Sequence, residues 1–172
     1  EELLEGPEVT VMCLTDGRAC AVLPPSQDHK RLLDDDKGPN TGGMGALAPA
    51  PLSAQTWKRI QDEILSPTLA GLAKDDLEYR GALYAGIMLT KDGPKLLEYN
   101  ARFGDPEIQA ILPLLKSDLV PILDDAVEGR LSMAQCQWEP GSFVCVVLAS
   151  GGYPGDFQIG KELQGLEQVK GR

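Results

Sequence analysis

The chain has 172 residues, of which 42% are hydrophobic, and its 26 acidic and 16 basic side chains give a formal net charge of −10 at pH 7. This apolar fraction excludes an intrinsically disordered chain, and the length suits one medium domain or one domain and part of another. The negative charge argues against non-specific binding to nucleic acid or to an anionic membrane.

The first half of the chain predicts an antiparallel hairpin followed by a long loop. Residues 9–14 and 18–23 are strand-like runs, joined through Asp16-Gly17, a dipeptide that tolerates the positive φ of a tight turn. Regular periodicity is absent from residues 24–51, where residues 38–45 are too rich in Gly and Pro for a helix or a central strand. Because a loop of this length is more often functional than accidental, we expect it to contribute to a site.

A helix and a second hairpin are predicted in the middle of the chain. Ser53 suits an N-cap, and apolar residues recur after it at helical spacing and continue past Pro67. Residues 82–90 and 95–100 are strand-like and flank a Gly-Pro turn. We therefore expect an α+β fold, in which the helix packs on an antiparallel sheet made of the two hairpins.

Two further helices are expected after residue 104. Residues 105–107 (Asp-Pro-Glu) are typical of a helix start, because Asp can cap, Pro suits the first position and an acid favours the positive end of the dipole. Pro113 should end that helix, residues 117–118 should begin another, and Gly129 should close it.

The last part of the chain predicts a separate unit. Residues 143–149 form an apolar run that predicts a buried strand, and a Gly- and Pro-rich turn follows it. We place a domain boundary near residue 131, dividing residues 1–130 from residues 131–172.

The cysteines indicate the cellular compartment. Cys13, Cys20, Cys136 and Cys145 lie in or beside apolar runs. Their spacing fits neither a metal site nor the dense cysteine framework of a small secreted domain. We expect reduced thiols in a cytoplasmic protein.

Polar residues at alternating positions of the second hairpin predict a metal site. Side chains alternate faces along a strand, so Glu98 and Asn100 should share one face, with Arg102 beyond them. Mg²⁺ prefers oxygen ligands and often takes only one or two from protein, the rest coming from water and phosphates. The alternative at this point is a solvated face of an antiparallel strand.

Five stretches form a recognisable combination: residues 26–31 (SQDHKR), 38–45 (GPNTGGMG), 83–86 (LYAG), 98–107 (EYNARFGDPE) and 151–156 (GGYPGD). Together, in this order and across essentially the whole chain, they resemble the phosphoribosylamine–glycine ligase (glycinamide ribonucleotide synthetase) family of the ATP-grasp superfamily. The resemblance implies an ATP-grasp large lobe in residues 1–130 and the start of a C-terminal domain in residues 131–172.

This resemblance implies an ATP-dependent ligase of purine biosynthesis. The family joins glycine to 5-phosphoribosylamine: ATP phosphorylates the glycine carboxylate, the sugar amine attacks the acyl phosphate, and ADP and phosphate are released. ATP and Mg²⁺ (or Mn²⁺) are the implied cofactors, nucleic acid and membrane are not implied partners, and fusion to other purine-pathway enzymes stays open. Such chemistry depends on positioning and charge neutralisation, which suits a sequence that offers metal ligands and cations but no nucleophile–base pair.

Carried over residue by residue, the resemblance gives the metal and nucleotide sites. Glu98 and Asn100 would hold the metal ion, and Arg102 would face the acyl intermediate, although an ion pair with Asp105 or Glu107 is an alternative for Arg102. The adenosine-binding residues would be Glu1, Leu4 and Glu8, with Glu8 accepting hydrogen bonds from the ribose. The alternative for that segment is an exposed acidic terminus.

Substrates are placed beside the Gly-rich loop. The implied substrate-binding residues are Asp28, Lys30, Arg31, Asn40, Thr41, Gly42, Gly43 and Arg102, and His29, Lys30 and Arg102 are the catalytic candidates. Backbone N–H groups of Gly42 and Gly43 can approach an anion because no Cβ interferes. Lys30 and Arg31 could equally form a solvated charge pair, and His29 could be structural rather than a proton acceptor.

Two other functions remain open. Another ATP-grasp carboxylate–amine ligase or a biotin-dependent carboxylase would share Glu98, Asn100 and Arg102 but not residues 28–31 and 40–45, and a noncatalytic scaffold would keep the fold without the chemistry. The family's N-terminal domain and the lobe that covers the ATP phosphates do not precede residue 1, and the sequence stops inside an apolar pattern. We therefore expect a fragment with little or no ligase activity on its own.

Overall fold

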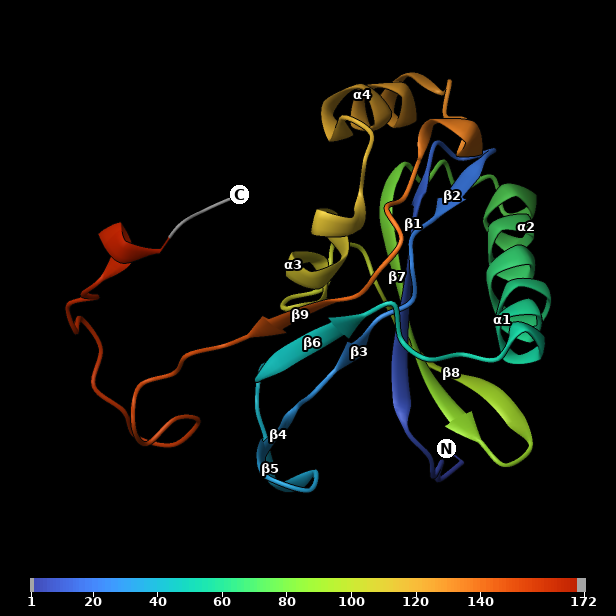
Figure 1. The fold of residues 1–172 in the computed structure, drawn as a ribbon. Coiled ribbons are helices and arrows are strands. Elements are labelled where there is room, and N and C mark those ends of the chain that lie inside the picture. The colour runs from blue at the N-terminus through green and yellow to red at the C-terminus, as the bar shows by residue number, and fades with distance from the viewer. Residues whose placement is uncertain (1, 170–172) are drawn as a thin grey trace.

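The computed structural model describes residues 2–169 as an α+β arrangement of antiparallel strands and short helices (Figure 1). In chain order the elements are β1 (Glu8–Thr15), β2 (Cys20–Val22), β3 (Gln27–Asp28), β4 (Arg31–Leu33), β5 (Lys37–Asn40), β6 (Gly45–Ala48), α1 (Ala54–Ile60), η1 (Gln61–Leu65), α2 (Ser66–Lys74), β7 (Gly81–Thr90), β8 (Gly93–Asn100), α3 (Glu107–Ile111), η2 (Leu112–Leu114), α4 (Leu119–Glu128), η3 (Met133–Gln135), β9 (Phe143–Val146) and η4 (Leu166–Gln168). No helix among these described residues is long and apolar enough to cross a membrane.

A four-stranded antiparallel sheet in the order β2-β1-β7-β8 forms the centre. The pairs β1–β2 and β7–β8 confirm the two predicted hairpins. The register shifts within β8, because Gly86 pairs with Glu98 while Ile87 pairs with Leu96. Leu97 is thus an extra residue, and a bulge of this kind lets the end of the strand aim its side chains differently.

One face of this sheet is covered by the predicted helix. α1, a π-helical turn η1 and α2 follow one another without a break, confirming continuation past Pro67 (Figure 1). Val11 and Ile87 from the sheet pack against Ile60 and Leu65 from this helical segment, and all of them are buried. The apolar face of the strands, which results from their period-two alternation, and the apolar stripe of the helical segment therefore pack together in one core.

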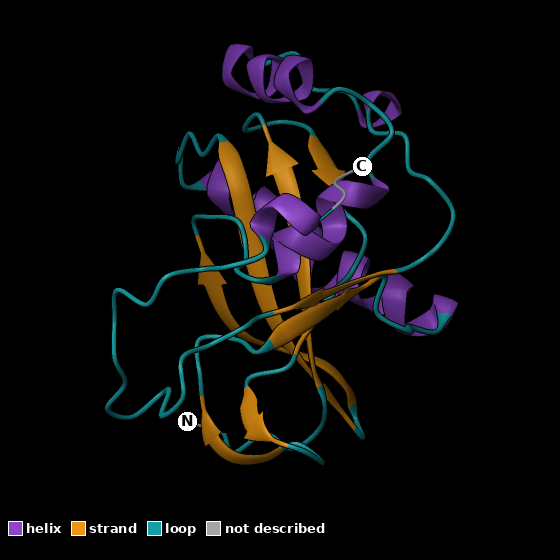
Figure 2. Cartoon of the chain, turned by 60° about the vertical axis from the view of Figure 1, so that its left-hand side comes forward, coloured by secondary structure: helices purple, strands orange, loops and turns teal. Residues whose placement is uncertain are grey.

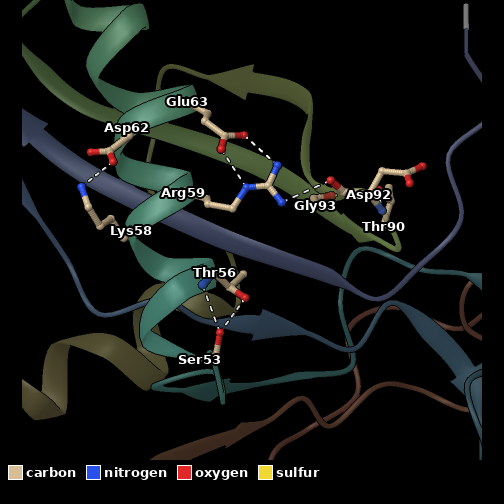
Figure 3. A network of polar contacts seen from close by, with 9 residues as sticks. All are labelled: Ser53, Thr56, Lys58, Arg59, Asp62, Glu63, Thr90, Asp92 and Gly93. Atoms are coloured by element: carbon tan, nitrogen blue, oxygen red, sulfur yellow. Dashed lines mark hydrogen bonds and ion pairs between the residues drawn. The ribbon is translucent and has the colours of Figure 1, made fainter.

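Polar contacts on the helix surface connect α1 with the turn between β7 and β8 (Figure 3). Ser53 accepts a hydrogen bond from Thr56 N at 3.0 Å and caps the helix as predicted. Arg59 binds Glu63 through its Nε at 2.7 Å and donates to the Asp92 carbonyl at 3.2 Å. The hydrogen bond from Arg59 to Asp92 joins the helical segment to this turn.

The opposite face packs on α3, η2 and α4. Met12 and Leu14 of β1 join Ile111, Leu114 and the buried stripe of α4 in a second core. α4 begins at Asp118, whose side chain accepts from Val120 N, and ends at Gly129 with φ 73°, which confirms its predicted limits. The prediction that Pro113 ends α3 also holds, since η2 replaces the helix there.

The prediction that residues 24–51 form a loop without strands is wrong. Short strands β3 to β6 run through this segment, with β4 paired to β5 and β6 placed between β3 and β9. The three-stranded sheet meets the central sheet at a bridge between Thr10 and Ser26. These strands depend on partners far away in the chain, which local periodicity does not reveal.

Two local predictions require correction. Asp105 does not cap α3: Pro106 takes the N-cap position, and the Asp105 carboxylate instead accepts from Gln109 at 2.6 Å. The strand at residues 143–149 is shorter than predicted and only half-covered, since Val144 and Val146 are 67% and 70% exposed. The alternate residues Phe143 and Cys145 pack against the second core, so one face of β9 is covered and the other is exposed.

The chain beyond β9 extends away from the packed elements (Figure 1), and Figure 2 shows it mainly as loop, with the short 3-10 helix η4 near its end. β9 itself pairs with β6, and Leu131 is buried in the second core. Residues on both sides of position 131 thus share one sheet, and the domain boundary there stays a prediction.

Candidate functional site

Glu98 and Asn100 lie side by side on one face of β8. The Asn100 side-chain amide donates to Glu98 Oε1 at 3.0 Å. Their partners on β7 are Gly86 and Tyr84, respectively. A Cβ on Gly86 would lie 3.5 Å from Glu98 Cγ, so the glycine leaves room for the carboxylate to lie over the sheet.

This pair fits a hard divalent cation. A carboxylate and an amide supply the oxygen donors that Mg²⁺ accepts, and a site completed by phosphates and water needs only one or two of them from protein. To bind a cation, Asn100 would turn its Oδ1 toward the ion. This is compatible with the structure, because the O and N of an amide are told apart only by their hydrogen bonds. Among residues 2–169, no group of three or more His, Cys, Asp or Glu side chains is placed to hold a metal ion by itself.

Arg102 lies on the same side, beyond the end of β8. Its guanidinium carbon is 5.8 Å from the centre of the Tyr84 ring, and Nη1 donates to the Phe103 carbonyl at 2.9 Å. A cation over an aromatic face is held in place without its charge being neutralised. Neither Asp105 nor Glu107 forms an ion pair with Arg102 in the described part of the chain, so its charge stays available.

A buried polar cluster lies behind Arg102. The Thr10 hydroxyl is hydrogen-bonded to the Tyr84 hydroxyl and to Glu107 Oε1, at 2.9 Å each. Glu107 is only 2% exposed and Thr10 only 4%. Burial, as the main cause, raises the pKa of Tyr84. These contacts fix the Tyr84 ring on which the guanidinium rests.

A cleft of about 500 Å³ adjoins this face. It is lined by Leu4, Glu5, Gly6, Pro7, Glu8, Gln27, Asp28, His29, Lys30, Arg31, Asp36, Asn40 and Met88. The two segments that the resemblance assigns to nucleotide and substrate thus meet at one cavity. Gly6 has φ 151°, and a Cβ there would lie 2.1 Å from the Leu89 carbonyl oxygen, so only glycine permits this backbone path.

Opposite charges pair inside the cleft. Lys30 Nζ contacts Glu8 Oε2 at 2.8 Å. Burial acts to lower the pKa of Lys30, but Glu8, with smaller contributions from Asp28 and Glu98, raises it overall. Lys30 is therefore a stable cation that links the cleft electrostatically to Glu98. Arg31 donates to the Gly38 carbonyl at 2.8 Å and so closes the β4–β5 hairpin.

Asp28 faces both the cleft and the buried cluster. Burial, followed by repulsion from Glu107, raises its pKa to about 7, and the opposing effect of Lys30 is smaller. Asp28 Oδ1 and Ser26 Oγ are buried and have no hydrogen-bond partner. Such unsatisfied atoms are uncommon and call for an explanation.

The Gly-rich loop differs from expectation. Gly42 N–H donates to the Tyr153 hydroxyl at 2.9 Å, and Gly43 N–H donates to Thr41 Oγ1 at 3.0 Å. The Thr41 hydroxyl in turn donates to the Lys30 carbonyl. These N–H groups are thus bonded within the chain and form no open anion cradle in this structure, and the substrate-binding role of the loop stays a prediction.

The structure brings most predicted site residues to one side of the molecule. Leu4, Glu8, Asp28, His29, Lys30, Arg31 and Asn40 line the cleft, whereas Glu98, Asn100 and Arg102 lie on the sheet face next to it. Glu1 lies outside the described residues. Sequence reasoning missed Thr10 and Tyr84 as site residues, and it considered Glu107 only as part of a helix start and as an alternative ion-pair partner of Arg102. A polar residue within the apolar run of β1 was the one available signal for Thr10.

Comparison with known proteins identifies the family. The family model of the phosphoribosylglycinamide synthetase ATP-grasp (A) domain matches residues 1–108. The trifunctional purine biosynthetic protein adenosine-3 of Gallus gallus is 54% identical over 172 residues, which are 99% of this chain and 17% of that protein. A phosphoribosylamine–glycine ligase of Caldanaerobacter subterraneus is 48% identical over 171 residues, 99% of this chain and 41% of its own length.

Solved structures agree with this match. The crystal structure of phosphoribosylamine–glycine ligase from Thermotoga maritima has a TM-score of 0.82 at 40% identity and covers 92% of this chain and 40% of that one. An L-amino acid ligase from Bacillus licheniformis shares the fold, with a TM-score of 0.61 at 18% identity over 87% of this chain and 37% of that one. The chain therefore belongs to the phosphoribosylglycinamide synthetase family and carries residues of its ATP-grasp (A) domain.

Proposed function

We propose that the chain forms part of the active site of an ATP-dependent ligase that joins glycine to 5-phosphoribosylamine through a glycyl phosphate. The products are glycinamide ribonucleotide, ADP and phosphate. The observation that carries this proposal is the convergence of Glu98 and Asn100 on one face, next to a cleft lined by Lys30. A non-catalytic scaffold has no need of such an arrangement.

Different residues would bind the metal ion, the nucleotide and the substrates. Glu98 and Asn100 would hold Mg²⁺ or Mn²⁺, which supplies neutralisation of phosphate charge when bound. Leu4 and Glu8 would border the adenosine of ATP. Arg102 would face the acyl phosphate with two parallel N–H donors, and its support on Tyr84 keeps it oriented.

Substrate contacts are proposed for the rest of the cleft. Lys30 and Arg31 would attract the anionic groups, because both are cations on the cleft wall. Asn40 and Thr41 lie at the start of the loop that brings Gly43 against Asp28. His29 is exposed there and stays a candidate rather than an assigned catalyst.

The chain spans 17% to 41% of the length of the relatives named above. We propose that residues 1–130 belong to the ATP-grasp lobe and residues 131–172 begin the next domain. The complete polypeptide would be cytoplasmic, in agreement with the four free cysteines, and the avian relative supports fusion to other purine-pathway enzymes.

Product formation by the complete polypeptide tests the function. Glycine, 5-phosphoribosylamine and Mg-ATP should yield glycinamide ribonucleotide, and Asn100→Ala should reduce kcat by about 10²–10³-fold, as for the loss of one electrostatic contact to a transition state. Glu63→Gln on the distant helix surface is the control. Product formation with bicarbonate or another amine acceptor, but not with these substrates, would contradict the proposal.

A further inference from the structure

Asp28 lies where the cleft meets the buried cluster, and neither metal binding nor phosphate binding explains its surroundings. Its Oδ1 is buried without a partner, and Ser26 Oγ, from a residue that is 0% exposed, also has none. Ser26 forms an antiparallel bridge with Thr10, so both side chains lie on the same face of the sheet as Asp28. That face also receives Glu107.

Packing holds Asp28 in this position. A Cβ on Gly43 would lie 2.8 Å from Asp28 Oδ1 and 2.4 Å from Pro106 Cδ, so the loop backbone presses the carboxylate toward α3. There Glu107 is held by Thr10 and forms no ion pair with any described residue. A buried acid without a cation beside it repels a second negative charge nearby.

We propose that Asp28 is the general base that accepts the proton of the attacking amine, and that Glu107 is a positioning residue that makes Asp28 basic enough for this step. The inference rests on the proposed ligase function. The sequence alone suggested His29 for this proton transfer.

The amine nitrogen of the sugar bonds to the acyl carbon of glycyl phosphate, the bond between that carbon and the phosphate oxygen breaks, and phosphate leaves with the electron pair. One proton passes from the nitrogen to Asp28. No oxidant, reductant or further co-reactant is needed.

The charges around Asp28 favour such a role. Burial and repulsion by Glu107 raise its pKa, Lys30 opposes the shift and Glu8 adds to it, and the result is about 7. Tyr84, on β7, is a neutral phenol near pH 7, and burial raises its pKa further. A base with a pKa near the working pH combines sufficient basicity with a large unprotonated fraction.

A comparison of half-reactions tests the assignment in the complete ligase. Asp28→Asn should slow amide formation by about 10²–10⁴-fold, the usual contribution of a general base. Glycine phosphorylation, measured by positional isotope exchange in ATP without 5-phosphoribosylamine, should fall far less. An equal loss in both half-reactions would overturn the proposal, since it would indicate a role in binding or folding.

The pH profile provides the second test. Activity should rise with pH as Asp28 loses its proton, and Glu107→Gln removes the repulsion, so the acid limb of kcat should move to lower pH. Glu8→Gln at the cleft rim should shift the acid limb in the same direction, and this variant replaces Glu107→Gln if the latter does not fold. Glu128→Gln on α4 is the matched control. An unmoved limb in both variants would overturn the inference, whereas a wild-type protein that makes no glycinamide ribonucleotide would instead refute the proposed function.

Discussion

The two faces of the central sheet use the same strands for different purposes. Toward α1 and η1, β1 and β7 present Val11, Ala85 and Ile87, and this layer is buried and apolar. Toward the cleft, the alternate residues include Thr10 and Tyr84, which belong to a polar cluster. Strand alternation thus lets one sheet combine a rigid apolar layer with a reactive surface.

The cleft-side face is itself divided along the strands. Near α4 it is closed by Met12, Leu14 and Ile122, whereas near β8 it carries Glu98 and Asn100. The apolar part anchors the strands on which the polar part is built. We therefore expect substitutions under α1 to reduce mainly stability, and substitutions near the cleft to reduce mainly ligand binding.

The largest stability effect is expected for Ile87→Ala. Ile87 is 0% exposed and lies under the helix, so the cavity should cost about 2–5 kcal/mol of unfolding free energy. Urea unfolding followed by tryptophan fluorescence would measure it, since Trp57 lies in the same packed layer. A cost close to that of a surface substitution would show that this face is not the rigid layer.

Gly43→Ala should have a smaller cost in stability and a greater effect on the cleft. The residue has φ 117°, and its Cβ would meet Pro106 and Asp28. We expect a loss of about 1–3 kcal/mol, typical of a strained backbone. The same unfolding experiment measures it, and Gly71→Ala, in an open position of α2, is the control. A stabilised Gly43 variant would contradict the packing described around Asp28.

Ser53→Ala removes the N-cap of α1, shown in Figure 3. Loss of one capping hydrogen bond should cost about 0.5–2 kcal/mol. Thermal unfolding by circular dichroism would detect it, and Ser53→Asp should restore most of the difference. If alanine at this position is neutral, packing of the helix on the sheet outweighs its cap.

The smallest effect is expected for Lys58→Ala. Lys58 contacts Asp62 at 2.5 Å, but the two side chains are 74% and 56% exposed. A solvated pair of this kind contributes about 0.3–0.5 kcal/mol. The difference in unfolding free energy between Lys58→Ala and the unchanged protein should be small at low salt and no larger at 1 M salt, because salt screens the pair. A cost above that of Ser53→Ala would refute this ranking.

Local signals explain what the sequence predicted correctly. Asp16-Gly17 located the first hairpin, Ser53 the start of α1, and Gly129 the end of α4, because each acts through its own backbone or its nearest neighbours. The short strands in residues 24–51 escaped prediction. β6 is stabilised by β9, about a hundred residues later in the chain, and that pairing leaves no local pattern.

The site shows the same contrast. Glu98 and Asn100 followed from alternation along one strand, and the resemblance supplied the cleft residues. Thr10 is separated from Tyr84 by 74 positions and from Glu107 by 97, so only the folded chain reveals their hydrogen bonds. An acid at the first turn of a helix is expected to be exposed, and the burial of Glu107 was therefore unexpected.

Binding of Mn²⁺ together with ATP to the complete polypeptide tests the metal site most directly, with electron paramagnetic resonance reporting free Mn²⁺. Glu98→Ala and Asn100→Ala should each weaken nucleotide-dependent Mn²⁺ binding by at least about tenfold, the scale seen when the surroundings of a metal site are altered. Glu63→Ala, on the opposite side of the sheet, should leave it unchanged. Equal Mn²⁺ affinity in all variants would contradict the assignment of this face to the cation.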